Sequence, residues 1–216
     1  MTLAAVQGQS RAVQVLRAAL QSGQVHHAWL FGGPIGVGKE ATAVGLAQAL
    51  LCTDAPGEGC GTCEACMRID KRLHPDVTWI MPGAEAVARG LVSKGDGTPS
   101  RDIRVEQIRG LQERLSLRAL EGKRKLAILV AADSMNDSAQ NALLKTLEEP
   151  PSDTSIILLA GGNTGPNGTL GGSFTIAGGW TMTPLAGTTV EGVALTMTTA
   201  NQGVGLQRFT QIGNPQ

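Results

Sequence analysis

Four cysteines lie close together in the first half of the chain, at Cys52, Cys60, Cys63 and Cys66. The last three form two C-x2-C steps that share Cys63, and Cys52 completes a set of four thiolates. Four sulfur ligands at this spacing are typical of a tetrahedral Zn²⁺ site with no open position, which is structural and not catalytic. An iron–sulfur cluster and disulfides are the alternatives, and a reducing compartment disfavours the disulfides. His74 is interpreted as part of a turn and not as a fifth ligand.

A glycine-rich stretch at residues 33–40 reads Gly-Pro-Ile-Gly-Val-Gly-Lys-Glu and matches the phosphate-binding pattern G-x-x-x-x-G-K. In such a loop, backbone N–H groups surround a phosphate chain, the following helix N-terminus adds partial positive charge, and the lysine reaches the outer phosphates. A strand expected before the stretch and a helix expected after it supply the context that the motif requires. A chance glycine-rich turn is the alternative. The predicted nucleotide-binding residues are Gly33, Gly36, Gly38, Lys39 and Glu40.

Two departures from the motif argue against ATP hydrolysis. Glu40 stands where the pattern has Ser or Thr, whose hydroxyl binds Mg²⁺, and a carboxylate there brings negative charge close to the phosphates. A working ATPase also carries Asp and then Glu at the end of a neighbouring strand, but Val130 and Ala131 occupy those positions here. Asp133 follows two residues later and is interpreted as a turn or capping residue. The sequence therefore predicts a weak or absent ATP site and no catalytic residues.

The composition of the chain indicates the cellular compartment and the kind of DNA contact that are compatible with these sites. The chain has 216 residues and a formal net charge of zero, so contact with DNA requires a local basic patch and not a global field. No apolar stretch reaches the length of a membrane-spanning helix, and the N-terminus lacks the pattern of a secretory signal. These features predict a cytoplasmic protein in a reducing compartment, where clustered cysteines bind metal.

Short apolar runs alternate with segments of helical periodicity through the first 160 residues. This alternation predicts an α/β fold with a parallel sheet and helices on both of its faces. The expected strands are residues 27–31, 77–81, 125–130 and 155–160, the expected helices are 9–21, 40–51, 105–120 and 136–149, and residues 84–101 are expected to form a loop.

Five motifs occur in one order along this part of the chain, and together they resemble the clamp-loader subunits of bacterial DNA polymerase III, an AAA+ group of gamma/tau and delta-prime subunits. Besides the glycine-rich loop and the cysteines, they are His-Pro-Asp at 74–76, Ile-Arg-Val-Glu-Gln-Ile at 103–108 and Asn-Ala-Leu-Leu-Lys-Thr-Leu-Glu-Glu-Pro-Pro at 141–151. The last motif is highly specific. The resemblance covers residues 1 to about 160.

The resemblance implies an AAA+ P-loop domain in a heteropentamer that opens the sliding clamp and places it on primed DNA during DNA replication. The implied partners are the gamma/tau and delta subunits, with the clamp and primer–template DNA reached through the complex, a component of a DNA-directed DNA polymerase, and no membrane. In this family gamma/tau subunits hydrolyse ATP, whereas delta-prime is typically the non-hydrolysing stator. Glu40, Val130 and Ala131 favour the delta-prime type. The cysteines would then be zinc ligands and the Lys39 loop a vestigial nucleotide site.

A change in composition near residue 160 divides the chain. Residues 1–160 carry 17 of the 18 basic and 17 of the 18 acidic residues, whereas 13 of the 29 glycines follow them. We expect a truncated AAA+ domain at 1–160 with a zinc module at 52–66. Residues 161–216 are expected to be a Gly/Thr-rich segment of unknown origin, either disordered or with short strands where residues 172–177 and 193–199 alternate.

The resemblance ends at the same place. The family's Ser-Arg-Cys motif, whose arginine reaches the ATP of a neighbouring subunit, has no counterpart, because the next arginine is Arg208. The family's lid and helical collar have no counterpart in this sequence either. A shifted reading frame, a chimeric assembly and a genuine fusion each account for such a change, and an artefact is favoured. Two alternatives to the stator role stay open: an ATP-hydrolysing gamma/tau-like subunit, and a truncated fragment without function.

Overall fold

The computed structural model describes residues 2–33, 35–93 and 97–161, together with the backbone of four short strands beyond them. The helices are α1 (Ser10–Gln21), α2 (Lys39–Leu51), α3 (Glu64–Asp70), α4 (Gly83–Ala88), α5 (Val105–Ser116) and α6 (Asp137–Glu148), with single 3-10 turns at Leu3–Ala5 and Ala132–Ser134. The strands are β1 (Ala28–Gly33), β2 (Val77–Ile80), β3 (Lys125–Val130), β4 (Thr154–Gly161), β5 (Phe174–Ile176), β6 (Trp180–Met182), β7 (Val193–Ala194) and β8 (Thr198–Thr199).

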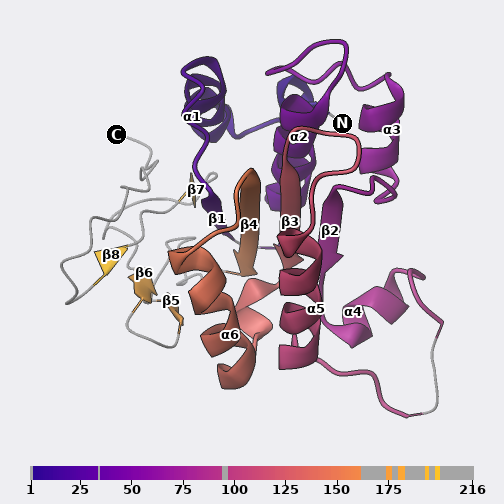
Figure 1. The fold of residues 1–216 in the computed structure, drawn as a ribbon, viewed down its shortest axis with the longest axis vertical. Helices are drawn as coiled ribbons and strands as arrows, with labels where there is room; N and C mark the ends of the chain where they lie inside the picture. Colours follow the sequence, from indigo (N-terminus) through magenta and orange to yellow (C-terminus); the bar gives the residue numbers. More distant parts are fainter. Residues whose placement is uncertain are drawn as a thin grey trace.

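The central sheet has the strand order β2-β3-β4-β1-β7 (Figure 1). The first four of these strands are mutually parallel, and β7 pairs antiparallel with β1. In the register of the sheet, Leu159 of β4 lies opposite Phe31 on one side and Val130 on the other. The carboxyl ends of β1, β3 and β4 therefore meet at one edge of the sheet, which is where open parallel sheets bind ligands.

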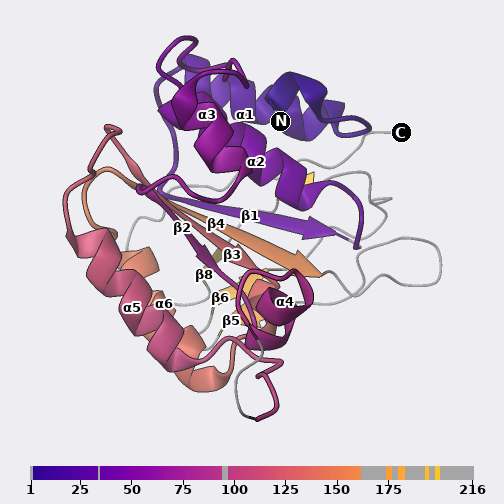
Figure 2. The ribbon, with the colours of Figure 1, turned by 90° about the vertical axis from the view of Figure 1, so that its right-hand side faces the viewer.

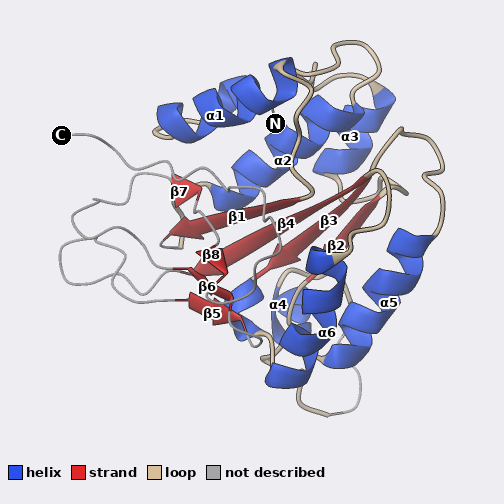
Figure 3. Ribbon diagram, turned by 60° about the vertical axis from the view of Figure 1, so that its left-hand side comes forward, coloured by secondary structure: helices blue, strands red, loops and turns tan. Residues whose placement is uncertain are grey.

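Helices cover both faces of the sheet (Figures 2 and 3). Helices α1, α2 and α3 lie on one face, and α5 and α6 lie on the other. The short helix α4 lies near the carboxyl ends of the strands, where its Ala86 packs against the core beneath α1 and α2. Alternate residues of the buried strand β3 point to the two sides, so Leu129 joins the core beneath α5 and α6 and Ile128 joins the core beneath α1 and α2. Burial on both faces explains why the inner strands are continuous apolar runs and not alternating ones.

The α/β class, the parallel sheet and the helices on both faces are confirmed. The expectation of a loop over residues 84–101 is wrong at its beginning, because Gly83–Ala88 form the helix α4. A helix of this length carries too little periodicity to detect, and it is fixed by contacts such as the one between Glu85 Oε1 and Arg89 Nε at 2.7 Å.

Most of residues 161–216 lie outside the described part of the chain, so the expected boundary near residue 160 and the nature of this segment stay predictions. The short strands β5 and β7 lie within the two stretches whose alternation favoured strands. Among the described residues, no helix is long and apolar enough to cross a membrane.

One buried carboxylate fixes the loop between α5 and β3. Asp76 Oδ1 accepts the backbone N–H of Leu120 at 2.6 Å, and its Oδ2 accepts those of Glu121 and Gly122 at 2.9 and 2.6 Å. Burial raises the pKa of this carboxyl, but the three N–H donors outweigh burial and hold the pKa below its ordinary value. Glu121 in turn pairs with Arg68 of α3, so Asp76 also fixes the position of the segment that carries the cysteines.

Replacement of the carboxylate by an amide tests this role. We expect Asp76→Asn to lower the free energy of unfolding by about 1–3 kcal/mol at pH 7, because an amide leaves buried N–H groups unpaired. The folded-state pKa is depressed, so the stabilisation is complete above the unfolded-state pKa and is lost as the pH falls through the folded-state value. Urea unfolding should show a constant difference between pH 7 and 5 that narrows below about pH 4. Asp102→Asn, at an exposed position, is the control, and an equal loss in both variants would contradict the prediction.

Candidate functional site

The four cysteines converge on one point between α2 and α3. Their Sγ atoms all lie within 4.8 Å of one another, and those of Cys52 and Cys63 are 3.8 Å apart. Cys52 follows the last residue of α2, and Cys63 caps the N-terminus of α3, where its sulfur accepts the N–H of Cys66 at 3.5 Å. Two helix ends therefore position two of the sulfurs, and the other two come from the linking segment and the first turn of α3.

The segment between the helices turns tightly enough to direct further N–H groups at the sulfurs. Gly59 and Gly61 both adopt positive φ angles, of 76° and 75°, which residues other than glycine rarely adopt. The N–H groups of Ala55 and Cys60 donate to the sulfur of Cys52 at 3.2 and 3.3 Å, and the N–H of Cys63 donates to that of Cys60 at 3.2 Å. Such donors stabilise the thiolate form, which is the form that binds metal.

The thiol pKa values differ across the cluster. For Cys63, desolvation acts upward, but backbone donors at Cys66 and Thr53 act more strongly in the other direction and lower its pKa to about 6. For Cys66 burial dominates and raises the pKa of the thiol. A cation bound at this point would stabilise the thiolate form of both cysteines, because its charge replaces the solvation that the buried sulfur of Cys66 lacks.

The cluster has the dimensions of a tetrahedral metal site. Zinc–sulfur bonds of about 2.3 Å place the sulfurs of a tetrahedron about 3.8 Å apart, which is the separation of Cys52 and Cys63. His74 lies elsewhere, because its Nδ1 accepts the N–H of Asp76 at 3.2 Å within the turn, as the sequence interpretation had it. The four cysteines are thus a group that could hold a metal ion. That they are zinc ligands stays a prediction.

The glycine-rich loop leads from the end of β1 into α2. Gly36 and Gly38 have φ angles of 85° and 95°, and Gly38 precedes the first residue of α2, Lys39. Gln9, which is buried, donates through Nε2 to the carbonyl of Val37 at 3.0 Å and so supports the loop from the start of α1. The expected strand–loop–helix context is present, and the role of the loop in phosphate binding stays a prediction.

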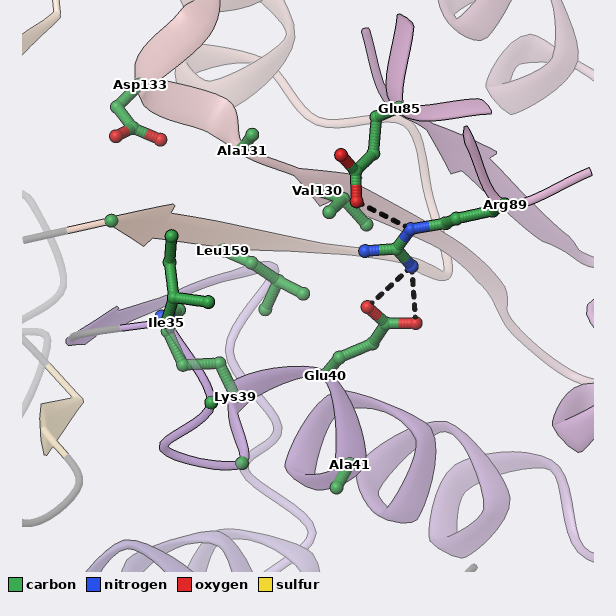
Figure 4. A pocket seen from close by; sticks show the side chains of 13 residues that line it. Ile35, Lys39, Glu40, Ala41, Glu85, Arg89, Val130, Ala131, Asp133 and Leu159 are labelled. Atoms are coloured by element: carbon green, nitrogen blue, oxygen red, sulfur yellow. Dashed lines mark hydrogen bonds and ion pairs between the residues drawn. The ribbon is translucent and has the colours of Figure 1, made fainter. Parts of the chain in front are cut away.

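A cavity of about 540 Å³ opens at the carboxyl edge of the sheet beside this loop (Figure 4). It is bounded by the loop and the start of α2, by the ends of β3 and β4, and by α4. Gly33 ends β1 at the same edge. The other four predicted nucleotide-binding residues, Gly36, Gly38, Lys39 and Glu40, all line the cavity. Val130, Ala131 and Asp133, which the sequence analysis named at the end of the neighbouring strand, line it too. The lining residues that the sequence did not single out are Ile35, Ala41, Glu85, Arg89, Leu159 and Gly161.

Glu40 is held by two arginines. Nη1 of Arg89 lies 3.0 and 2.8 Å from the two carboxylate oxygens of Glu40 (Figure 4). Arg72 pairs with one of the same oxygens. Burial raises the pKa of Glu40, but Arg89 and Arg72 outweigh it and keep the pKa below its ordinary value. The carboxylate is therefore ionised, and its oxygens are engaged by protein donors. We call Glu40, Arg72 and Arg89 the arginine clasp.

The opposite side of the cavity carries Lys39 and Asp133. Burial lowers the pKa of Lys39, and the charge of Asp133 opposes that shift. Val130 and Ala131 line the cavity where a P-loop ATPase has its Asp and Glu, and Ala131 adopts a φ of 54° that turns the chain into the 3-10 turn. Of the two interpretations of Asp133, the turn is the correct one, because Asp133 lies within the 3-10 turn and Asn136 caps α6. Asp133 also lines the cavity (Figure 4).

Sequence reasoning did not identify Arg72, Glu85 or Arg89 as part of the site. Arg89 follows a short helix inside a segment that the sequence presented as a loop, and Arg72 follows α3 with a φ of 58°. The one local signal was the spacing of Glu85 and Arg89, four residues apart, which is the spacing of an ion pair on a helix. The contact of either arginine with Glu40 depends on tertiary structure.

Comparison with known proteins supports one family. The family model described as DNA polymerase III, delta subunit, matches residues 8–165. The chain is 36% identical to DNA polymerase III subunit delta' of Bacillus subtilis over 70% of this chain and 41% of that protein. It is 38% identical to subunit delta' of Pseudomonas aeruginosa over 62% of this chain and 37% of that protein. It is 32% identical to subunit tau of Escherichia coli K12 over 73% of this chain and 22% of that protein.

A solved structure of a gamma subunit-related protein from Thermotoga maritima covers 68% of this chain and 38% of that one, at 18% identity and a TM-score of 0.40, which is too low to add to the assignment. The chain spans about two fifths of the length of the delta' relatives. The family model covers more than half of the chain, and the curated relatives named delta' agree with it. The chain therefore belongs to the clamp-loader family described as DNA polymerase III, delta subunit.

Proposed function

We propose that this chain acts as a delta-prime-type subunit of the DNA polymerase III clamp loader, a stator that does not hydrolyse ATP and helps to load the sliding clamp on primed DNA. The observation that carries the proposal is the arginine clasp. Glu40 occupies the position of the metal-binding Ser or Thr, and its oxygens are engaged by Arg89 and Arg72. To bind Mg²⁺ beside a nucleotide, Glu40 would have to give up these charge-assisted hydrogen bonds.

The opposite wall of the cavity supports the same proposal. Val130 and Ala131 provide no oxygen ligand for Mg²⁺ and no carboxylate to activate water. Asp133 follows in the adjoining 3-10 turn, and its charge opposes the burial-induced lowering of the Lys39 pKa. In the proposed role residues 1–160 form the AAA+ module, and the partners are the gamma/tau and delta subunits, with DNA reached through the assembled complex in the cytoplasm.

ATP turnover separates the stator from the ATPase alternative. We expect the purified full chain to hydrolyse ATP no faster than its Lys39→Ala variant, because the Glu40 carboxylate is engaged by two arginines and Val130 and Ala131 offer no oxygen ligand. The measurement is phosphate release at saturating ATP and Mg²⁺, with a gamma/tau subunit as the positive control. Turnover that disappears in Lys39→Ala would instead assign the chain to the ATP-hydrolysing type.

Assembly separates the stator from a fragment without function. In the proposed role the chain co-elutes with purified gamma/tau and delta subunits of the same organism in size-exclusion chromatography. If circular dichroism shows that the chain is folded but the chain elutes separately from the other subunits, the result would support the fragment alternative and rule out the stator.

We further propose that Cys52, Cys60, Cys63 and Cys66 hold one structural Zn²⁺ ion. Four soft ligands around one point suit a closed tetrahedral site, and in the described part of the chain the group contains no His, Asp or Glu besides these four cysteines. Bound there, zinc supplies a cross-link between the end of α2 and the start of α3 and no reactive position. The N–H donors to Cys52 and Cys60 supply the outer hydrogen bonds that orient such ligands.

Metal content and Co²⁺ substitution test the assignment. We expect one zinc ion and no iron per chain by elemental analysis, and a Co²⁺-loaded protein with the visible spectrum of a tetrahedral thiolate site. Cys60→Ala should lower Co²⁺ affinity by more than about a hundredfold, because it removes a direct ligand. His74→Gln is the matched control and should leave stoichiometry and spectrum unchanged. Stoichiometric iron with inorganic sulfide would establish the cluster alternative instead.

A further inference from the structure

The arginine clasp brings together three charged side chains from separate parts of the chain. Glu40 comes from the first turn of α2, Arg72 from the end of α3 and Arg89 from the end of α4. Each side chain keeps only 26–30% of its surface exposed. Arg72 also lies over the ring of Trp79, with 4.8 Å between its guanidinium carbon and the ring centroid, and Arg89 donates through Nε to Glu85. Both guanidinium groups are thus fixed in place by second contacts.

Two fixed guanidinium groups around one anion form an arrangement that recognises phosphate as well as carboxylate. Arginine presents parallel N–H donors whose spacing fits the oxygens of either group, so a carboxylate and a phosphate compete for the same donors. Arg89 holds both oxygens of Glu40, and Arg72 holds one. In the clasp the Glu40 carboxylate occupies the position that a phosphate group would take.

The arginine clasp lies where a phosphate group could compete with the Glu40 carboxylate for the arginine donors. Glu40 is adjacent to Lys39 at the N-terminus of α2, and the same cavity is lined by the glycines of the loop and by Arg89. A phosphate chain that followed this loop would next reach Arg89, which lines the cavity, and behind Glu40 its ion-pair partner Arg72. Removal of the Glu40 carboxylate would leave the Arg89 donors directed at the cavity and would release Arg72 from the anion that it binds.

We propose that Arg72 and Arg89 form a latent phosphate-binding site for a nucleoside di- or triphosphate bound without a metal ion, and that Glu40 is the internal competitor that keeps it closed. The inference rests on the proposed non-hydrolysing role and names the contact that closes the nucleotide pocket. The guanidinium groups take over the neutralisation that Mg²⁺ provides in an active P-loop site.

Charge balance in the cavity gives the reason why the site is closed. Its lining includes two cationic side chains, Lys39 and Arg89, and three carboxylates, Glu40, Glu85 and Asp133. A phosphate chain that entered would meet this excess of negative charge and would also have to displace Glu40 from its two arginines. Conversion of Glu40 to the neutral isostere removes both obstacles together, since it leaves two cations against two carboxylates and frees the donors of Arg72 and Arg89.

The test is binding of a fluorescent methylanthraniloyl derivative of ADP to the full, metal-loaded chain, in EDTA-free buffer with and without Mg²⁺. We expect Glu40→Gln to bind the probe at least about tenfold more tightly than the wild type, the range expected for hydrogen bonds to a charged group. The gain should be the same without Mg²⁺, and inorganic pyrophosphate should displace the probe, which identifies the phosphate chain as the group recognised.

Two further variants separate the effect of the clasp from a general effect of charge, and a third serves as a substitute. Arg89→Gln in the Glu40→Gln background should abolish the gain, because it removes the recovered donors. Glu85→Gln also removes one carboxylate beside Arg89 but leaves Glu40 bound, so we expect less than a twofold change. If Glu40→Gln is less folded than the wild type by circular dichroism, Glu40→Thr replaces it, with the same expected gain.

Several outcomes would overturn the inference. Equal affinity of wild type and Glu40→Gln, whether tight or undetectable, would show that Glu40 does not compete with phosphate. A gain that requires Mg²⁺ would contradict metal-free binding, and an equal gain in Glu85→Gln would reduce the effect to net charge. None of these results decides the proposed stator role, which depends on ATP turnover and on co-elution with the other subunits.

Discussion

Parallel pairing of β1, β4 and β3 is the constraint on which the rest of the structure depends. Because these strands run in one direction, the segments that follow them emerge at the same edge of the sheet. The glycine-rich loop follows β1, Ala131 and the 3-10 turn follow β3, and Gly161 ends β4. Continuous burial of the inner strands on both faces keeps this register, since a slip of one residue would move every side chain to the opposite face. The cavity is a consequence of that pairing.

The sequence was sufficient where local pattern and tertiary structure agree. Buried parallel strands are apolar runs, so β3 was predicted with its observed bounds, and α6 was predicted to end before Pro150 because proline removes a donor from the helix. The cysteine cluster was predictable because C-x2-C spacing already brings thiolates within reach of one ion. Prediction failed for α4, whose one and a half turns carry no detectable period, and for Arg72 and Arg89, whose role exists only through contact with Glu40.

Helices α2 and α3 link the two sites. Helix α2 begins beside the loop, with Lys39 and Glu40, and ends next to Cys52. Helix α3 begins after Cys63 and ends just before Arg72, so the two helices are joined by the cysteine cluster at one end and by the Glu40–Arg72 ion pair at the other. Gln48, buried in α2, donates to the carbonyl of Cys66 at 3.0 Å and adds a contact near the cysteine end. The cysteine cluster and the Glu40–Arg72 ion pair therefore fix the relative position of α2 and α3 at both ends.

The glycine-rich loop keeps its geometry through contacts within the protein. The loop geometry depends on Gly36 and Gly38 and on support from Gln9, none of which requires a bound nucleotide. Replacement of a hydroxyl by the Glu40 carboxylate would leave an unpaired, half-buried charge, which is costly, unless donors already lay close by. Arg89 and Arg72 meet that need and join α2 to both α3 and α4. The contact that would disfavour metal binding in the proposed role thus also stabilises the walls of the pocket.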